Sequence, residues 1–325
     1  MAWIDGIAQI CVVTSDLRTV VGAFADRLGI GPWKVWRFEA PRLFQMSVGG
    51  RPADYSMELA LAYCGAMQIE VIQPISGDTV YARFLSAVSS GGVQHAMISS
   101  RARFGVSMRR LADAGYAEVQ SARVNTATAI GRVTIPRLPN RLVGSLATRF
   151  AFVGGREVLG TTIEVGAYPP GVSPLMAWKL GKADVIVEAS GPQLFSTLGG
   201  LAIACSNVGA AARAWERAGF SPFVRSGSIS GSTGDVGEES WASAGRPGSI
   251  ELLGPGEPAI GAPSHPGVAW VSANVARGAL DDAIDELVTG GARELARFAH
   301  PLAGPTALLS HPAFGSTPIA LRARR

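Results

Sequence analysis

Apolar and polar positions along the chain repeat one plan, an apolar strand followed by an amphipathic helix. Residues 7–30, IAQICVVTSDLRTVVGAFADRLGI, begin with an apolar run and continue through Ser15 and Asp16, which are typical helix N-caps. The apolar residues behind this cap recur at helical spacing: Val20, Val21, Phe24 and Leu28. The plan returns over three further ranges: 93–116, 201–220 and 268–292. The pattern therefore predicts four copies of a strand-then-helix unit.

After each predicted helix the chain continues in short alternating segments rich in β-forming residues. Each series ends in an apolar strand: MQIEVIQP (67–74), GTTIEVG (160–166), GSIELLG (248–254) and TPIALRA (317–323). One unit thus holds one helix and four strands in roughly 70 to 80 residues, a βαβββ module. Because a lone module exposes one face of its sheet, we expect two modules to join side by side as a curled eight-stranded cup. Four modules predict an α+β protein of two tandem domains.

The domain limits follow from length and from one Pro- and Gly-containing stretch. At 325 residues the chain is longer than the ~100–200 residues of a typical domain. We expect modules 1–75 and 90–170 to form a first domain over residues 1–170. The stretch AYPPGVSPL introduces a linker over residues 171–192. Residues 193–325 then form the second domain.

Composition and charge limit the class of protein. Hydrophobic residues make up 47% of the sequence and charged residues 17%, which is ample for two cores and excludes general disorder. The net charge of +4 is mild and its Lys and Arg residues are scattered, so we expect no nucleic-acid partner. Cys11, Cys64 and Cys205 lie in apolar stretches without a CxxC pair, which indicates buried thiols in a reducing cytosol.

Targeting signals are not found in the sequence. The start MAWIDGIAQI lacks the basic region and apolar run of a secretory signal. No stretch reaches the ~18 uninterrupted apolar residues that a membrane-spanning helix needs. We therefore expect a cytoplasmic protein whose partner is a small molecule rather than a membrane, and which has the option of forming a homodimer.

Four polar residues in the first half lie inside otherwise apolar predicted strands. They are Gln9, Glu70, His95 and Glu164. Each would point into a core without a partner, and a divalent metal ion is an economical partner for all four. Taken singly, each has a structural explanation: a strand-end amide for Gln9, the edge of a half-exposed strand for the two glutamates, and a hydrogen-bonded core histidine for His95. Together the set favours a metal site.

At this point the chain resembles the vicinal-oxygen-chelate superfamily, which includes glyoxalase I, methylmalonyl-CoA epimerase, extradiol dioxygenases and bleomycin-resistance proteins. The resemblance rests on QICVVTSDL followed by RLGIGPW, on IEVIQP, on GGVQHAMI and on LGTTIEV, and covers residues 5–168. The second half is similar more loosely, through AGF, SIELLGP and LLSHPAFGSTPIAL. The resemblance implies the fold of two tandem glyoxalase-like domains.

The resemblance also implies a ligand set. Gln9 lies seven residues before Asp16, and His95 lies seven residues before Ala102, where the family often has an acid. Glu70 and Glu164 match the ligand position on the last strand of each module. The implied set of Gln9, Glu70, His95 and Glu164 has the residue types of the animal glyoxalase I. One imidazole, two carboxylates and an amide oxygen suit Zn, Ni, Co, Mn or Fe(II), with positions left open for substrate.

The same counting in the second half gives residues that mostly cannot bind a metal. They are Gly200, Glu251, Gly267 and Ala320. We therefore expect the second domain to be a degenerate copy. Pairing the first module with the second keeps all four candidate ligands in one cup, whereas pairing the first with the fourth keeps at most three. Sequential pairing is the prediction.

The implied chemistry is proton transfer next to a carbonyl. A metal with open positions can chelate two neighbouring substrate oxygens and stabilise an enolate. The resemblance assigns proton transfer to Glu164, with Glu70 as the second candidate. We expect a metal-dependent isomerase, epimerase or lyase. Two alternatives remain: a non-catalytic binding or resistance protein of the same fold, and an Fe(II) extradiol dioxygenase, which would require two histidines and one glutamate in one cup.

Other features are expected to have structural roles. Residues 226–240, SGSISGSTGDVGEES, match no phosphate-binding loop and are predicted to be a mobile loop that is able to act as a lid. Four arginines near one helix start, namely Arg101, Arg103, Arg109 and Arg110, suit a solvated helix face better than an anion site. We assign no role to the remaining histidines: His265, His300 and His311.

Overall fold

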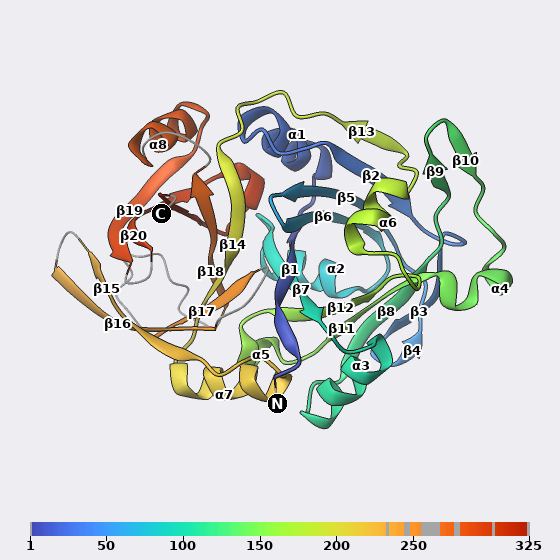
Figure 1. Ribbon diagram of the computed structural model, residues 1–325, viewed down its shortest axis with the longest axis horizontal. Coiled ribbons are helices and arrows are strands. Elements are labelled where there is room, and N and C mark those ends of the chain that lie inside the picture. Colours follow the sequence, from blue (N-terminus) through green and yellow to red (C-terminus); the bar gives the residue numbers. More distant parts are fainter. Residues whose placement is uncertain are drawn as a thin grey trace.

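Two curled β-sheets lie side by side, the first built from the N-terminal part of the chain and the second from the C-terminal part (Figure 1). The computed structural model describes residues 2–231, 234–243, 248–254, 267–275, 280–300 and 303–323. The predicted α+β fold of two tandem cups is confirmed. Among the described residues, none of the helices has the length and apolar character to cross a membrane.

The first sheet contains eleven strands. In spatial order they are β13 (Val185–Val187), β2 (Trp33–Phe38), β5 (Ser56–Cys64), β6 (Met67–Ser76), β1 (Ile4–Val13), β7 (Gly92–Ser100), β12 (Thr162–Ala167), β11 (Thr148–Val153), β8 (Glu118–Val124), β3 (Leu43–Val48) and β4 (Arg51–Pro52). In this spatial order, the eight consecutive strands that start with β2 and end with β8 form the two predicted modules. The other three extend the sheet: the β3–β4 hairpin pairs with β8, and β13, from the segment predicted as a linker, pairs with β2.

The first two modules pair sequentially, as predicted. Strand β1 pairs in parallel with β6 of its own module and antiparallel with β7 of the next, and β7 pairs in parallel with β12. These four central strands each carry one of the four candidate ligands. The topology therefore places all four in one sheet, on strands that are direct neighbours.

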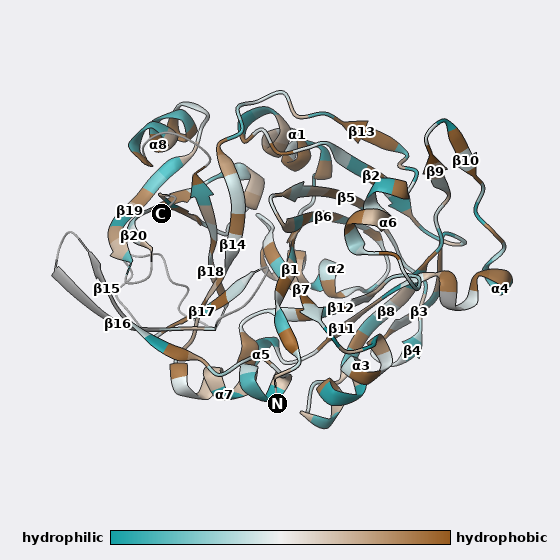
Figure 2. Cartoon of the chain, in the orientation of Figure 1, coloured by the Kyte–Doolittle hydropathy of each residue, from teal (hydrophilic) through white to brown (hydrophobic). Residues whose placement is uncertain are grey.

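The module helices begin where the sequence predicts and cover the outer faces of the sheets. They are α1 (Leu17–Arg27), α3 (Phe104–Asp113), α7 (Val208–Ala218) and α8 (Leu280–Thr289). In α1 the Asp16 side chain accepts a hydrogen bond from the Thr19 amide, as an N-cap does, and Phe24 packs against the rings of Trp33 and Phe314. Hydrophobic and hydrophilic stretches alternate along α3 and α7 (Figure 2), as expected of surface helices.

Shorter elements connect the modules. They are α2 (Val80–Ala87), α4 (Asn140–Val143), α5 (Arg156–Leu159), α6 (Pro174–Leu180), the 3-10 helices η1 (Gly144–Leu146) and η3 (Pro312–Phe314), and the separate hairpin of β9 (Thr128–Ile130) and β10 (Val133–Ile135). Helix α6 and strand β13 both fall in the range predicted as a linker. Their backbone is ordered against the first sheet, because Asp184 donates its amide to the Val35 carbonyl and β13 follows it.

The second sheet closes into an eight-stranded barrel. Its order is β14 (Phe195–Ala204), β17 (Ser249–Leu253), β16 (Gly234–Ala242), β15 (Val224–Gly231), β19 (Arg293–His300), β20 (Gly304–Ser310), β21 (Ile319–Arg322) and β18 (Gly267–Val275), which pairs again with β14. The prediction of a mobile loop over residues 226–240 is wrong: this range contributes to β15 and β16, and residues 232–233 lie outside the described part. Sheet pairing uses backbone groups, so a Gly- and Ser-rich composition did not reveal these strands.

The two sheets share one apolar core and several polar contacts. The Val93 amide in β7 donates to Thr317 Oγ1 at 2.9 Å, and the Tyr116 hydroxyl donates to the Ala214 carbonyl at 2.9 Å. Gly160 adopts φ +74°, and a Cβ there would lie 2.2 Å from Ile203 Cγ2 across the contact. Only glycine fits this position without displacing the second barrel.

Candidate metal centre

The four candidate ligands are all buried on the concave side of the first sheet. Their exposed fractions are 3% for Gln9, 6% for Glu70, 0% for His95 and 7% for Glu164. The strand register places the four residues at two levels along the strands. Gln9 and Glu164 are both paired with Met97, whereas Glu70 and His95 are both paired with Cys11. The apolar strands that predicted this set thus bring its members to one place.

His95 contacts both candidate carboxylates. Its Nε2 lies 3.1 Å from Glu70 Oε2 and 3.2 Å from Glu164 Oε2. Its Nδ1 donates to Gln94 Oε1 at 2.6 Å, and Gln94 in turn donates through its Nε2 to Thr162 Oγ1 at 3.2 Å. A carbonyl oxygen can only accept, so Nδ1 carries a proton and Nε2 faces the carboxylates.

Three electronegative atoms converging in a buried place require a shared cation. Without one, the Nε2 lone pair would face two negative oxygens at contact distance. Glu164 Oε2 is buried and has no hydrogen-bond partner among the described residues. Imidazole and carboxylate donors with an unsatisfied buried oxygen fit a divalent metal ion. The structure therefore suits the predicted cofactor, although the role of each residue as a ligand stays a prediction.

In the absence of metal the shared cation is a proton on His95. Burial alone would lower the pKa of His95, but hydrogen bonds and charges from Glu164 and Glu70 outweigh it and raise the pKa to about 9. Burial also raises the pKa of Glu164, and the neighbouring Glu70 adds to this, while His95 acts in the opposite direction.

Cys11 is the functional candidate that the sequence analysis missed. It is paired with Glu70 on β6 and with His95 on β7, and donor atoms of these three residues all lie within 4.8 Å of one another. Gln9 makes no hydrogen bond or ion pair to the other candidate ligands among the described contacts. Cys11 shares the concave face with Gln9 because the two are two positions apart on β1. That alternation was the available signal, and it was read only as an apolar strand residue.

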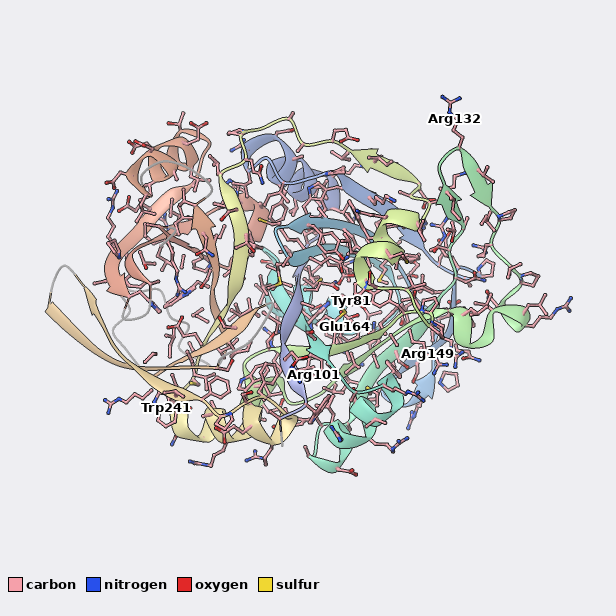
Figure 3. All side chains as sticks on the ribbon, viewed as in Figure 1. Tyr81, Arg101, Arg132, Arg149, Glu164 and Trp241 are labelled. Carbon is pink, nitrogen blue, oxygen red and sulfur yellow. The ribbon has the colours of Figure 1, made fainter. Side chains whose placement is uncertain are left out.

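A pocket opens above this cluster. Gln9, Glu70 and Glu164 line its polar end. Seven aromatic residues contribute to its walls: Trp36, Phe38, Tyr81, Phe150, Phe152, Tyr168 and Trp178. Figure 3 shows Tyr81 and Glu164 together inside the first sheet. Of the two tryptophans near the GIGPW segment, Trp36 lines the pocket and Trp33 lies in the core on the other face.

Helix α6 forms one wall of the pocket, a contribution that sequence reasoning did not foresee. Trp178 reaches across to donate its Nε1 hydrogen to the Leu61 carbonyl at 3.0 Å. Lys34 Nζ donates to the carbonyls of Trp178, Lys179 and Gly181 at 2.7–2.9 Å, which stabilises the C-terminal end of the helix. The segment between the two sheets therefore belongs to the wall of the site.

The four arginines near the start of α3 are exposed and do not line the pocket. Arg101 pairs with Asp5, and Arg110 lies over the Trp3 ring. The interpretation as a solvated helix face is consistent with this exposure.

In the second barrel, register corrects one counted position. Ala202 on β14 is paired with Glu251 on β17 and with Trp270 on β18, at the level of the candidate site in the first sheet. Gly267, where counting from the helix placed the counterpart of His95, lies three residues earlier. For Gly200 and Ala320, the strand register agrees with the positions obtained by counting. Three of the four positions thus still lack a metal-binding side chain.

A different polar cluster occupies this level of the second barrel. Glu251 accepts hydrogen bonds from His300 Nε2 at 2.5 Å and from Arg322 Nη2 at 3.1 Å, and His300 Nδ1 accepts from the Ala303 amide. His300 is buried at the end of β19, so leaving it without a role was wrong. His311 caps η3 through its Nδ1, and His265 lies outside the described residues. An internal guanidinium here compensates the carboxylate charge.

Arg322→Met should destabilise the protein by about 3–5 kcal/mol, because it leaves Glu251 buried without its cation. Burial would raise the pKa of Glu251, but His300 and Arg322 outweigh it and lower the pKa. The cluster therefore stabilises the fold at pH values above the ordinary glutamate pKa. This contribution is lost as the pH falls through the lowered pKa of Glu251. Urea unfolding at pH 7 and pH 4 measures both effects. Arg297→Met, which breaks only exposed ion pairs, should cost about 1 kcal/mol or less; equal losses in the two variants would contradict the prediction.

Comparison with known proteins gives a family match for part of the chain and a fold match for nearly all of it. Residues 8–133 match the model of the family described as Glyoxalase/Bleomycin resistance protein/Dioxygenase superfamily. A mutant 4-hydroxymandelate synthase from Streptomyces coelicolor has a similar structure, with a TM-score of 0.58 and 14% identity over 99% of this chain and 93% of that one. No protein of curated function matches the sequence significantly.

Two further solved structures are similar over the same extent. A catechol 2,3-dioxygenase has a TM-score of 0.53 and 13% identity, with 100% of this chain and 89% of that chain covered. The Mn(II)-bound glyoxalase from Novosphingobium aromaticivorans has a TM-score of 0.51 and 11% identity, with 99% and 83% covered. At these identities the similarity concerns the fold alone.

Proposed function

Because the chain belongs to the glyoxalase, bleomycin-resistance and dioxygenase superfamily, we propose that it is a divalent-metal-dependent enzyme that moves a proton next to a carbonyl of a small oxygenated substrate. The reaction class is that of an isomerase, epimerase or lyase. One observation carries the proposal: His95 Nε2 and an oxygen from each of Glu70 and Glu164 converge beside a pocket that both glutamates line.

The residues that would hold the metal are Gln9, Glu70, His95 and Glu164. The metal, when bound, supplies positive charge that stabilises an enolate oxygen. Zn, Ni, Co, Mn and Fe(II) are all compatible with imidazole, carboxylate and amide donors. Gln94 holds the His95 ring so that Nε2 faces the site, which orients the donor before any metal arrives.

Glu164 is the residue that we assign to proton transfer. Its Oε2 has no hydrogen-bond partner among the described residues, and the residue lines the pocket. A carboxylate held this way can remove a proton from the carbon beside a substrate carbonyl and return it to the same or a neighbouring carbon. Glu70 is the second candidate, because it also lines the pocket and its Oε2 lies 3.1 Å from His95 Nε2, against 3.2 Å for Glu164.

The pocket walls favour a substrate with a flat or apolar body. Seven aromatic side chains line the cavity, and the candidate ligands Gln9, Glu70 and Glu164 line it as well. A ligand with neighbouring oxygen atoms at one end and an aromatic or alicyclic body at the other satisfies both regions. The walls would exclude water from the reacting carbon and so protect an enolate from unspecific protonation.

The same walls favour one second candidate, a non-catalytic protein that sequesters an apolar compound. Such a protein would bind its ligand equally well with and without metal. Ring cleavage by Fe(II) is less compatible with the pocket, since no histidine other than His95 is found at this site in the described part of the chain, and the extradiol set contains two.

The test combines metal analysis with solvent exchange. The purified full-length chain is analysed for metal, loaded with one divalent ion, and incubated in D2O with a panel of aromatic and alicyclic hydroxyketones, ketoacids and their thioesters. We expect close to one metal ion per chain and deuterium at the carbon beside the carbonyl, without oxygen uptake. Stoichiometric metal without exchange in any bound compound would overturn proton transfer. Tight, metal-independent binding without exchange would establish the sequestering protein instead.

A further inference from the structure

We propose that Cys11 binds the metal as a thiolate together with Glu70 and His95, so that Glu164 is left off the metal as the free base. This inference rests on the proposed function. It changes the ligand set from nitrogen and oxygen donors alone to one that includes sulfur, and it gives the two buried glutamates different tasks.

The first step of the argument is register. Cys11 on β1 is the direct partner of Glu70 in the parallel pair and of His95 in the antiparallel pair. Gln9, two positions earlier, is paired with Gln68 and Met97 instead. Residues at directly paired positions have their Cβ atoms about 4.5–5.5 Å apart, so their side chains meet without extending along the strand. The β1 residue at the level of the imidazole is therefore the cysteine.

The second step is distance. The Cys11 Sγ and the nearest donor atoms of Glu70 and His95 all lie within 4.8 Å of one another. Donors around one tetrahedral ion lie roughly 3 to 4 Å apart, because metal–ligand bonds are about 2.0–2.3 Å long. Adjustments of about 1 Å in the side chains would bring all three to one ion. Cys11 is fully buried and lies among the apolar residues beneath the pocket, so solvent does not compete for its sulfur.

The third step is the position of Glu164. Its Oε2 is buried and lies 3.2 Å from His95 Nε2, beside the three proposed ligands. With Cys11, Glu70 and His95 as three protein ligands, the centre has the number of protein ligands common to catalytic zinc sites, where the fourth position is open. Glu164 then lies next to the ion without being needed as a ligand.

A sulfur ligand changes the expected metal. Thiolate favours Zn and Co(II) over Mn(II), whereas an all-oxygen and imidazole set discriminates less. We therefore expect Zn or Co(II) to displace Mn(II) from this protein when the ions compete at equal concentration.

The test uses the metal-free full chain loaded with Co(II). Thiolate bound to Co(II) gives an intense near-ultraviolet charge-transfer band that oxygen and nitrogen ligands do not give. We expect this band in the wild-type protein and its loss in Cys11→Ser and Cys11→Ala. Cys64→Ser is the matched control, because Cys64 is equally buried but belongs to the core on the other face of the sheet, so its band should remain.

X-ray absorption on the zinc-loaded wild type keeps the inference testable if the variants fail to fold. A sulfur neighbour at about 2.3 Å is expected. One metal ion per chain with neither the band nor the sulfur neighbour would overturn the role of Cys11 while leaving the proposed metal enzyme intact. A band that survives in Cys11→Ala would also overturn it. Failure of the wild type to bind any divalent ion would instead remove the proposed function, and this inference with it.

Discussion

Glu164→Gln should lower the rate of solvent deuterium exchange into a substrate by about 10²- to 10⁴-fold, even with metal in excess. The amide keeps the size and an oxygen donor of the glutamate but cannot accept a proton at neutral pH. Glu164 lines the pocket and its Oε2 lies 3.2 Å from His95 Nε2, so this carboxylate faces both the candidate metal site and the cavity. Exchange followed by NMR, with metal content measured on the same sample, gives the result.

Two controls separate chemistry from folding and from metal loss. Glu157→Gln removes an exposed carboxylate from the same module and should leave exchange unchanged. Glu70→Gln should reduce exchange mainly by weakening metal binding, so that added metal restores part of the rate. If excess metal also restored the exchange rate of Glu164→Gln, Glu164 would act only as a metal ligand. Glu70 would then be the candidate for the base.

The sequence predicted the position of the candidate site because each polar residue interrupts an apolar strand. Gln9, Glu70, His95 and Glu164 had no reason to occur there unless they met a partner, and local patterning was sufficient to select them. Sequential pairing of the modules followed from the requirement that these residues share one cup. The strand register of the structure agrees with that requirement.

Counting along the chain was less successful where connections differ in length. Gly267 lies seven residues before Asn274, but the structure places Asn274 within β18, and α8 begins only at Leu280. The seven-residue count therefore started from a strand residue and reached Gly267 instead of Trp270. Only the strand pairing, which is set by contacts distant in sequence, corrects such an offset.

Contributions from distant segments were also beyond local patterning. Trp178 enters the pocket wall because Lys34, far away in sequence, binds the end of its helix. His300 precedes a proline and resembled a loop residue, yet it is buried against Glu251 because the barrel closes. Cys11 was classed correctly as a buried thiol, but its neighbours on β6 and β7 could be identified only from the register.

His95→Asn should reduce metal affinity by more than the 10- to 100-fold expected for loss of an orienting partner alone. It removes the nitrogen that lies 3.1 Å from Glu70 and 3.2 Å from Glu164. Gln94→Leu removes only the acceptor that orients the His95 ring, so its loss of metal affinity should be smaller than that of His95→Asn. Isothermal titration with Zn²⁺ measures both. Equal affinity in the wild type and His95→Asn would exclude this histidine as a ligand.

The metal-free proteins should differ in stability as well. In the wild type the proton on His95 compensates two buried carboxylates, whereas His95→Asn leaves them to repel each other, a loss of about 3–5 kcal/mol at pH 7. The pKa of His95, raised from 6.5 to about 9, sets the direction with pH. Its stabilising contribution, about 3 kcal/mol, is complete below pH 6.5 and is lost as pH rises towards and through 9.

Metal binding should show the opposite pH dependence, because the ion replaces the proton on His95 Nε2. Affinity for Zn²⁺ should therefore rise between pH 6.5 and 9, with release of about one proton from the imidazole for each ion bound. Release of a second proton would be expected if the Cys11 thiol also ionises, so proton counting in buffers of different ionisation enthalpy connects this prediction to the proposed sulfur ligand. A Zn²⁺ affinity that is constant over this pH range, together with a metal-free stability that is also constant, would show that His95 carries no exchangeable proton between the two carboxylates.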